Sequence, residues 1–411
     1  MSKSVVGTVA IVGQGYVGLP LAMATSIAGW KTVGVDKSAK VVSSLNTGLS
    51  HIEDVKNDDL KRVVESGVYV ASTDFSKVSS AQVCVICVPT PVDSHGNPDL
   101  SHLENAVISI APHLENGTLL INESTSFPGT LKDLIIPLVQ LHRESGTDSL
   151  QFASAPERVD PGNTSWNMKS TPRLVSGIDE ESKDRVLSFY DSICEKVILV
   201  SSPEVAEMAK LLENTFRQVN IALVNQLVPL CHALGIEIRE VIEAAGSKPY
   251  GFMKFYPGAG VGGHCIPVDP LYLLWKARNM GVELPFVAEA DQVNRSMPEY
   301  VVERLIAIAR PQKGSYIGVM GVSYKTGVSD TRESPAEDVM KALTKKGFLP
   351  IWCDSLVHDF HGFEKYDQQE LAGAIIVTNQ ANLPIKALSS AGVKILDCTG
   401  VFKGLPGIEQ L

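Results

Sequence analysis

The sequence predicts an α/β protein in which two parallel-sheet domains are joined by a central all-helical segment with one long helix. Two observations predict this fold class. In the first half of the chain, and again after Pro311, short apolar runs of strand length alternate with helical stretches. From about Ser202 to Pro311, only helical patterns occur. Strands that alternate with helices indicate βαβ units, and such units build parallel sheets.

Five apolar runs in the first half have the length of strands. They hardly alternate between apolar and polar residues, which is typical of strands covered by helices on both faces. The expected strands are Thr8–Val12, Thr32–Val35, Val83–Val88, Leu119–Asn122 and Phe152–Ala155. The expected helices between them include Leu19–Ala28, Lys40–Asn46 and Leu103–Ala111.

The central segment opens with the longest helical pattern, which begins at Pro203 and ends at about Leu234. Proline suits the first turn of a helix, and Gly235 is a typical stop. A second helix is expected from near Pro267 to about Met280. A third runs from Phe286 to Ala309, and we expect Pro298 to break it.

The last part of the chain returns to alternating strands and helices. The expected strands are Tyr316–Met320, Leu349–Cys353, Ala374–Thr378 and Val393–Leu396, with a helix at Ala336–Lys345. We therefore expect three domains, at residues 1–201, 202–310 and 311–411.

Composition excludes several classes of protein. The chain has 411 residues, with 36 Lys and Arg against 46 Asp and Glu, so its formal net charge is −10. This acidic balance argues against a nucleic-acid partner. No apolar run approaches the ~18 residues of a membrane span, and the N-terminus lacks the features of a signal peptide. Seven scattered cysteines favour a reducing compartment over a disulfide framework. We therefore expect a cytoplasmic protein without membrane insertion.

A glycine motif, Gly13-Gln-Gly-Tyr-Val-Gly18, follows the first expected strand and opens the first helix. In this context Gly13 permits a tight turn, Gly15 lets the backbone approach a pyrophosphate, and Gly18 lets helix and strand pack closely. Free N–H groups at the helix start attract phosphate. Asp36 ends the second strand, where a carboxylate binds a ribose 2′-hydroxyl and repels a 2′-phosphate. The motif predicts a Rossmann-like domain that binds NAD rather than NADP.

A second motif, Cys84-Val-Ile-Cys87, has Cys-x-x-Cys spacing but lies inside an expected strand. Side chains alternate between faces along a strand, so these two thiols should point in opposite directions. We expect two buried cysteines that act as small apolar residues, and no metal site.

The segment with the most chemical information is Gly258-Ala-Gly-Val-Gly-Gly-His-Cys265, just before the second expected helix of the central segment. Glycines allow a substrate to approach closely. A helix N-terminus lowers the pKa of a nearby thiol, which makes thiolate available at neutral pH. These features favour Cys265 as a nucleophile over a buried cysteine beside a flexible loop. For His264 we expect a structural or substrate-contact role.

Two further groups of residues leave alternatives open. Lys210 and Asn214 share one face of the long helix, and Arg217 lies near that face. They either point into a polar cleft or form a solvated helix edge, which is the commoner case. In the last domain, Gly321–Lys325 follows a strand and precedes a turn and a helix. This segment either binds a second phosphate-bearing ligand, or forms only a turn in which Ser334 caps the helix.

Taken together, the motifs resemble those of the nucleotide-sugar (UDP-glucose/GDP-mannose) 6-dehydrogenase family, in family order and over nearly the whole chain. The segments that carry the resemblance are Gly13–Pro20, Val88–Pro91, Glu123–Thr125, Ala155–Arg158, Glu207–Asn214, Gly260–Pro270 and Thr331–Pro335. The resemblance implies oxidation of the C6 hydroxyl of a UDP-sugar to a carboxylate, with reduction of two NAD. It also implies that the three domains bind NAD, supply dimerisation and catalysis, and bind the UDP-sugar, in a homodimer or higher homo-oligomer joined along the long helix.

The same resemblance implies roles for individual residues. Cys265 would capture an aldehyde as a thiohemiacetal, which is then oxidised to a thioester. The implied catalytic residues are Cys265, Lys210, Asn214, Asp269, Glu157 and Thr125. The implied NAD contacts are Gly13, Gly15, Tyr16, Val17, Gly18, Asp36, Thr90, Thr125 and Arg332, the last serving the neighbouring subunit's cofactor. The implied UDP-sugar contacts are Glu157, Arg158, Val159, Lys210, Asn214, Arg217, Tyr256, Gly262, Gly263, Tyr324 and Lys325.

One segment departs from the family pattern. Many members carry an Asp-x-Arg sequence near the C-terminus, whose arginine reaches the nucleotide. Here the segment is Asp397-Cys-Thr399, and threonine cannot supply that charge. Our hypothesis is that Lys394 or Lys403 replaces it.

The substrate itself is indicated by the loop Lys248–Pro257 and the sequence Gly-His-Cys265. Both resemble the branch that acts on UDP-N-acetylhexosamines, which favours UDP-N-acetylglucosamine over UDP-N-acetylmannosamine and UDP-glucose. Two alternatives remain at this point. One is a two-electron dehydrogenase of the hydroxyacid type, and the other is a non-catalytic nucleotide-sugar-binding protein.

Overall fold

The computed structural model describes residues 6–93, 95–159 and 165–411. These residues form two compact units. Unit 1 comprises the described residues up to Glu213 together with Leu271–Asn279, and unit 2 comprises Asn214–Pro270 and Met280–Leu411. The boundaries fall inside two helices, so the division into three domains stays a prediction.

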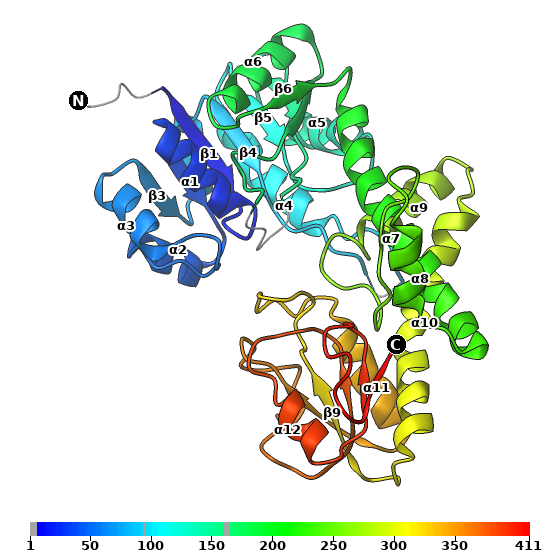
Figure 1. Cartoon of the computed structure of the whole chain (residues 1–411). Coiled ribbons are helices and arrows are strands. Elements are labelled where there is room, and N and C mark those ends of the chain that lie inside the picture. Colours follow the sequence, from blue (N-terminus) through cyan, green and yellow to red (C-terminus); the bar gives the residue numbers. More distant parts are fainter. Residues whose placement is uncertain (1–5, 94, 160–164) are drawn as a thin grey trace. The chain divides into compact units, whose positions relative to one another are not determined.

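Unit 1 is built on an eight-stranded sheet with the strand order β3-β2-β1-β4-β5-β6-β7-β8 (Figure 1). In the described part of the chain each pair is parallel except β6 and β7, which run antiparallel. The strands are β1 (Thr8–Val12), β2 (Lys31–Val35), β3 (Tyr69–Ser72), β4 (Val83–Ile86), β5 (Leu119–Asn122), β6 (Gln151–Ser154), β7 (Arg173–Gly177) and β8 (Val197–Leu199).

Helices cover both faces of this sheet. Along β1, Val9 and Ile11 pack into one core with α1 and α6, whereas Ala10 and Val12 pack into another with α4 and α5. A strand buried on both faces has no polar side, so its apolar run does not alternate. The helices are α1 (Gly18–Ala28), α2 (Ala39–Asn46), α3 (Asn57–Glu65), α4 (Ser101–Ile110), α5 (Ile136–His142) and α6 (Glu180–Asp191), with short turns η1 (Phe75–Ser80), η2 (Ala111–His113) and η3 (Leu131–Ile135).

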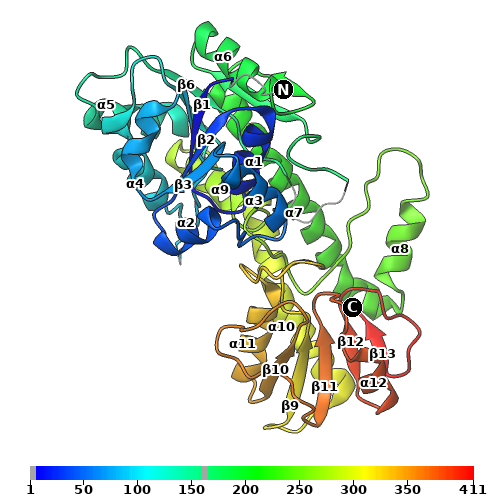
Figure 2. The same ribbon diagram turned by 90° about the vertical axis from the view of Figure 1, so that its left-hand side faces the viewer.

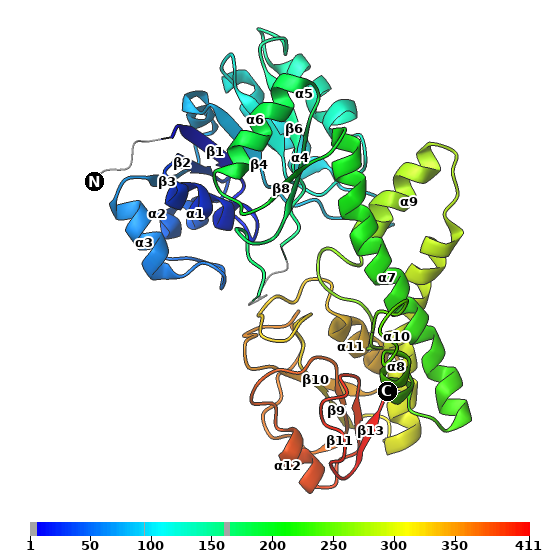
Figure 3. The same ribbon diagram turned by 45° about the horizontal axis from the view of Figure 1, so that its top comes forward.

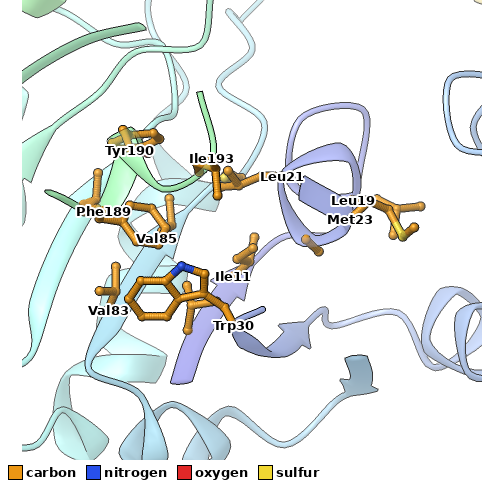
Figure 4. Packing of buried hydrophobic residues seen from close by; sticks show 14 of the residues in the cluster. Ile11, Leu19, Leu21, Met23, Trp30, Val83, Val85, Phe189, Tyr190 and Ile193 are labelled. Atoms are coloured by element: carbon orange, nitrogen blue, oxygen red, sulfur yellow. The ribbon is translucent and has the colours of Figure 1, made fainter. Parts of the chain in front are cut away.

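Figure 4 shows the first of these cores, where aromatic side chains from distant segments meet. The rings of Trp30 and Phe189 pack edge to face, with centroids 5.2 Å apart. Trp30 Nε1 donates to Ser192 Oγ at 3.0 Å, so the N–H of this buried indole has a hydrogen-bond partner. The two thiols of the Cys-x-x-Cys motif lie in different cores, Cys87 in this one and Cys84 in the other, as the alternation along the strand predicts.

Long helices connect the two sheets in sequence. α7 (Pro203–Leu234) has the bounds that the sequence predicts, and Gly235 follows it with φ of 69°. α8 (Ile238–Ala245), α9 (Asp269–Asn279) and α10 (Pro285–Ala309) follow. In the described part of the chain no single helix is long and apolar enough to cross a membrane, although α7 and α8, bent by 117° at their junction, pass that test as a pair by length and composition.

The expected break at Pro298 is wrong, because α10 continues through this residue without interruption (Figure 3). Proline removes one helical hydrogen bond, the one that the carbonyl of Asn294 would accept. Pro298 is buried, and so are Met297 and Val301 beside it, in the core of unit 2. Burial of this face offsets the missing bond and keeps the helix continuous.

Unit 2 contains a five-stranded parallel sheet with the order β10-β9-β11-β12-β13 (Figure 2). The strands are β9 (Tyr316–Met320), β10 (Leu349–Cys353), β11 (Leu371–Ile376), β12 (Ile395–Asp397) and β13 (Ile408–Gln410), with helices α11 (Pro335–Lys345) and α12 (Ile385–Ser390). The expected strands and helix of this part are present, with β11 shifted toward the N-terminus by a few residues.

Candidate active site

In unit 1, the predicted site residues collect at the carboxyl edge of the sheet. Gly13–Gly18 follows β1, Asp36 follows β2, and Thr90 lies in the segment after β4. Thr125 follows β5, and Glu157 follows β6. Because these strands are parallel, their carboxyl ends share one edge, which is where open α/β sheets bind ligands. The strand order reverses between β1 and β4, so the glycine motif lies at the switch point.

The three glycines of the motif have different surroundings. A Cβ on Gly13, whose φ is 91°, would lie 2.3 Å from the carbonyl oxygen of Cys87. A Cβ on Gly18 would lie 1.8 Å from the carbonyl oxygen of Gly13. Around Gly15 there is nothing within 4 Å of a Cβ, so its backbone faces open space. Gly13 and Gly18 are thus tightly packed, whereas Gly15 between them is open, which is the arrangement that lets a pyrophosphate approach the backbone.

The neighbouring groups also fit NAD. The N-terminus of α1 has neither a capping side chain nor an acidic residue in its first turn, so Tyr16 and Val17 lead into a helix start that remains available to an anion. The Asp36 carboxylate is fixed by two N–H groups, from Gln14 at 2.9 Å and from Ser38 at 2.8 Å. Thr90 is buried and Thr125 is half-buried on the same edge.

Glu157 is buried, and both of its carboxylate oxygens accept hydrogen bonds. Its Oε1 accepts the N–H groups of Arg158 at 2.6 Å and Val159 at 2.7 Å, and its Oε2 accepts from Arg173 at 2.7 Å. Burial raises the pKa of this carboxyl, but the charge of Arg173, these hydrogen bonds and the charge of Lys210 outweigh burial and leave the pKa below its ordinary value. Glu157 is therefore a carboxylate at neutral pH.

Arg158 is held by a second acid of unit 1. Its guanidinium bonds both carboxylate oxygens of Glu213, at 2.5 and 3.1 Å, and donates to the carbonyl of Pro172 at 2.9 Å. A UDP-sugar contact for Arg158 stays a prediction, and it would have to share this guanidinium with Glu213.

Two of the three polar residues predicted to share a face of α7 are buried, so they do not form a solvated edge. Lys210 and Asn214 are 7% and 6% exposed, whereas Arg217 is exposed. Asn214 Nδ2 donates to Asp269 Oδ2 at 2.5 Å, and Asp269 is itself buried at the first turn of α9. The structure thus joins two of the predicted catalytic residues within unit 2.

Cys265 differs from the other six cysteines, because it is exposed whereas they are buried or half-buried. None of the seven, all within the described residues, forms a disulfide. The carbonyl of Cys265 accepts the N–H groups of Val268 at 3.3 Å and Asp269 at 2.9 Å. The thiol therefore stands one turn before α9, which begins two residues later than the sequence predicts.

The glycine loop before Cys265 packs on the segment that follows β9. A Cβ on Gly263 would lie 2.9 Å from the Tyr324 ring, and a Cβ on Gly262 would lie 2.8 Å from Pro335. The N–H of Gly263 donates to the carbonyl of Arg332 at 3.3 Å. Only glycines allow this approach, which brings four of the predicted ligand contacts together in unit 2.

Other predicted contacts surround this loop. Burial, followed by the charge of Arg332, lowers the pKa of His264, so its imidazole is neutral. Lys325 is half-buried beside Tyr324, and the guanidinium of Arg332 pairs with Asp330 at 2.6 Å. The Tyr256 hydroxyl donates to Glu243 on the exposed side of unit 2, and Tyr256 itself is 41% exposed.

The segment after β9 also contains the helix cap that the sequence left open. Ser334 Oγ accepts the N–H of Ala336 at 3.3 Å at the start of α11. At the neighbouring strand, a Cβ on Gly321 would lie 1.9 Å from the carbonyl of Thr378, between the ends of β9 and β11. This is the switch point of the second sheet.

Sequence reasoning missed several charged residues. Arg173 and its bond to Glu157 gave no signal, because a lone arginine in an apolar run has no motif. Near Thr399, the structure shows Arg239 of α8, whose Nη2 donates to the carbonyl of Cys398 at 2.8 Å. Lys403, one candidate for the missing charge, pairs with Glu237 at 2.7 Å, and Lys394 is exposed. The roles of both lysines stay predictions.

Three family models match most of the chain. They are the NAD-binding domain of the UDP-glucose/GDP-mannose dehydrogenase family at residues 7–194, its central domain at 204–296 and its UDP-binding domain at 318–390.

Individual relatives agree with this assignment. A UDP-N-acetyl-D-mannosamine dehydrogenase from Methanocaldococcus jannaschii is 37% identical over 357 residues, which cover 86% of this chain and 80% of the relative. A UDP-N-acetyl-D-glucosamine 6-dehydrogenase from Pseudomonas aeruginosa is 35% identical over 345 residues, covering 82% and 80%. The solved structure of a UDP-D-ManNAc dehydrogenase from Pyrococcus horikoshii matches at 29% identity with a TM-score of 0.86 and covers 98% of both chains. The chain therefore belongs to the UDP-glucose/GDP-mannose dehydrogenase family and is an NAD-dependent nucleotide-sugar dehydrogenase.

Proposed function

We propose that this enzyme oxidises the C6 hydroxyl of a UDP-N-acetylhexosamine to a carboxylate, in a four-electron reaction through a thioester on Cys265. The observation that carries the proposal is the exposed thiol of Cys265 in a glycine loop one turn before α9. A two-electron dehydrogenase, or a protein that only binds the nucleotide sugar, needs no nucleophile at this place.

When bound, NAD accepts the two hydrides of this oxidation, one for each molecule of cofactor. Gly13, Gly15 and the N-terminus of α1 would hold its pyrophosphate, and Asp36 its ribose. The surroundings of Gly15 support this assignment, since nothing lies within 4 Å of a Cβ there.

Covalent capture by Cys265 explains how a four-electron oxidation proceeds without release of an aldehyde. The thiolate adds to the C6 aldehyde and forms a thiohemiacetal, which stays on the enzyme until it is oxidised to the thioester. Water then cleaves the carbon–sulfur bond and returns the thiol. Glu157, a carboxylate at neutral pH, would organise the water and proton traffic of this step.

Lys210 and Asn214 would stabilise the oxygen that becomes negative during thiol addition and hydrolysis. The contact of Asn214 with Asp269 supports this role, because it fixes the orientation of the amide. Lys210 and Asn214 are four residues apart on α7, so the helix also fixes their separation.

The N-acetylhexosamine class rests on the loop Lys248–Pro257 and on the relatives. The loop favours UDP-N-acetylglucosamine, and relatives named for N-acetylmannosamine and N-acetylglucosamine are similar to this chain at 37% and 35% identity. Both sugars are therefore candidate substrates.

A panel of UDP-N-acetylglucosamine, UDP-N-acetylmannosamine, UDP-glucose and GDP-mannose tests the proposal, with NADH formation measured by absorbance. We expect kcat/KM to be highest for one of the two N-acetylated sugars. Higher kcat/KM for UDP-glucose or GDP-mannose than for both would contradict the proposed class.

We also propose a homodimer or higher homo-oligomer joined along α7. Among the exposed apolar residues of this helix are five, 37 to 63% exposed, in its second half: Phe216, Leu223, Leu227, Leu230 and Leu234. Their spacings of seven, four, three and four residues place them on one stripe of the helix, as in helix pairs. Arg332 of a neighbouring subunit remains a proposed contact of NAD.

A further inference from the structure

Unit 1 contains a buried charge cluster behind the carboxyl edge of its sheet. Arg173 is 2% exposed, and its guanidinium lies between two acids. Its Nη2 is 2.7 Å from Glu157 Oε2, and its Nη1 is 3.5 Å from Glu123 Oε1. We call these three residues the buried triad. Neither Arg173 nor Glu123 has a part in the mechanism above.

The antiparallel strand β7 explains how this arginine reaches Glu157. Arg173 is the first residue of β7, which runs opposite to β1–β6, so this first residue lies at the carboxyl edge of those strands. The register pairs Ser154 with Ser176. If this register is extended by three residues beyond Ser154, Glu157 lies opposite Arg173.

The charges of the triad do not balance if both acids are ionised. Burial raises the pKa of Glu123 to about 7, so Glu123 is in part protonated at neutral pH. The Tyr190 hydroxyl donates to Glu123 Oε1, and Cys87 Sγ lies 3.8 Å from its Oε2. When Glu123 is protonated, Glu157 is the only acid of the triad that is ionised, and it pairs with the positive charge of Arg173.

We propose that Arg173 is a positioning residue, which holds the Glu157 carboxylate in place and ionised for the reaction proposed above. With Oε2 fixed by Arg173, Oε1 receives the N–H groups of Arg158 and Val159. The same bonds fix the backbone of Arg158 and Val159, for which UDP-sugar contacts are predicted. The inference rests on the proposed function, because the role of Arg173 depends on the role proposed for Glu157 in the reaction.

The test compares Arg173→Met, which removes the charge, with Arg173→Lys, which keeps the charge but not the two-nitrogen geometry. The titratable groups around Glu157 are Arg173, Glu123, Lys210, Cys87 and Cys194, with Tyr190 beside Glu123. Without Arg173, burial is less opposed and the Glu157 pKa rises. We therefore expect Arg173→Met to move the acid limb of kcat/KM upward by at least about one pH unit. We expect Arg173→Lys to leave that limb in place and to raise KM for the UDP-sugar about tenfold.

Arg143→Lys is the matched control. Arg143 is 5% exposed in the same unit, but its guanidinium bonds neutral groups, among them the carbonyl of Leu114 at 2.8 Å and Asn116 Oδ1 at 2.6 Å. We expect this variant to lose stability without a change in the acid limb or in KM.

Two outcomes would overturn the proposal. One is a folded Arg173→Met enzyme with the wild-type acid limb and KM. The other applies if Arg173→Met does not fold: an Arg173→Lys enzyme that loses only stability, as the control does. Calorimetric Kd values for the UDP-sugar need no turnover, so they separate this inference from the proposed function. A wild-type enzyme that forms no carboxylate would contradict only the proposed function. An Arg173→Lys enzyme with unchanged Kd and KM for the UDP-sugar would contradict only the inference about Arg173.

Discussion

Single residues of this enzyme owe their roles to their surroundings, and the glycine motif shows this most directly. Gly13 and Gly18 are required by neighbouring backbone oxygens at 2.3 and 1.8 Å from a Cβ. Gly15 is not required by the protein itself, because its surroundings are empty to 4 Å. The free chain should therefore tolerate a methyl group at Gly15, and the bound cofactor should not.

This contrast predicts opposite behaviour for two variants. We expect Gly15→Ala to keep the wild-type melting temperature but to raise the Kd for NAD at least about tenfold, because the methyl group displaces the pyrophosphate. We expect Gly18→Ala to melt several degrees earlier, because the backbone must move. Calorimetry and thermal unfolding measure both, and the Kd for the UDP-sugar is the internal control. Wild-type NAD affinity in Gly15→Ala would contradict the assignment of this motif to the cofactor.

Glu123 predicts a pH dependence of stability. Burial raises its pKa from the ordinary value of 4.5 to about 7 in the folded chain. The folded state therefore holds a proton that the unfolded state loses. The stability from this proton is fully present below about pH 4.5 and is lost as the pH rises through about 7, at up to about 1.4 kcal/mol per pH unit.

A glutamine cannot titrate, so the stability of Glu123→Gln relative to wild type should increase from pH 5 to pH 8. Denaturant unfolding at a series of pH values measures this difference. The exposed Glu65→Gln serves as control, and its stability should follow wild type across the series. A constant difference between Glu123→Gln and wild type over that range would show that Glu123 does not bind this proton.

At the scale of elements, the sequence predicts what periodicity and motifs encode. It predicts α7 to the residue, and it predicts β1, β5, β9 and β10 with their bounds, because apolar runs and flanking glycine or proline mark them. It does not predict β7, which begins with the buried charge of Arg173. The partner that makes this arginine tolerable, Glu157, lies in a different strand region, so only tertiary structure reveals it.

The start of α11 gives a prediction at this scale. Ser334 caps the helix and is 2% exposed. We expect Ser334→Ala to lower the free energy of unfolding by about 1 kcal/mol and to leave KM for the UDP-sugar within about twofold. Chemical unfolding and steady-state kinetics measure the two effects. The comparison is Ser38→Ala, since Ser38 Oγ caps α2 by accepting the N–H of Val41 at 3.3 Å. A tenfold rise in KM without loss of stability would mean that Ser334 binds the ligand rather than the helix.

At the scale of the whole molecule, the proposed oligomer makes the stripe on α7 testable. Leu223 and Leu230 are 55% and 54% exposed, which is unfavourable for large apolar side chains in a monomer. We expect light scattering to give a dimer or larger for wild type and a monomer for the Leu223→Glu and Leu230→Glu double variant. Glu65→Gln again serves as control. A monomeric wild type, or a double variant that assembles as wild type does, would exclude this stripe as the interface.

If Cys265 holds the substrate between the two oxidations, the enzyme cannot form a carboxylate without this thiol. Carboxylate product and NADH are quantified by mass spectrometry and absorbance for wild type and for Cys265→Ser. We expect two NADH for each carboxylate in wild type and no carboxylate from the serine variant, because a serine hydroxyl stays protonated at neutral pH and is a much weaker nucleophile than a thiolate, and because an ester is hydrolysed more slowly than a thioester. Carboxylate formed by Cys265→Ser at the wild-type rate would contradict the proposed thioester on Cys265.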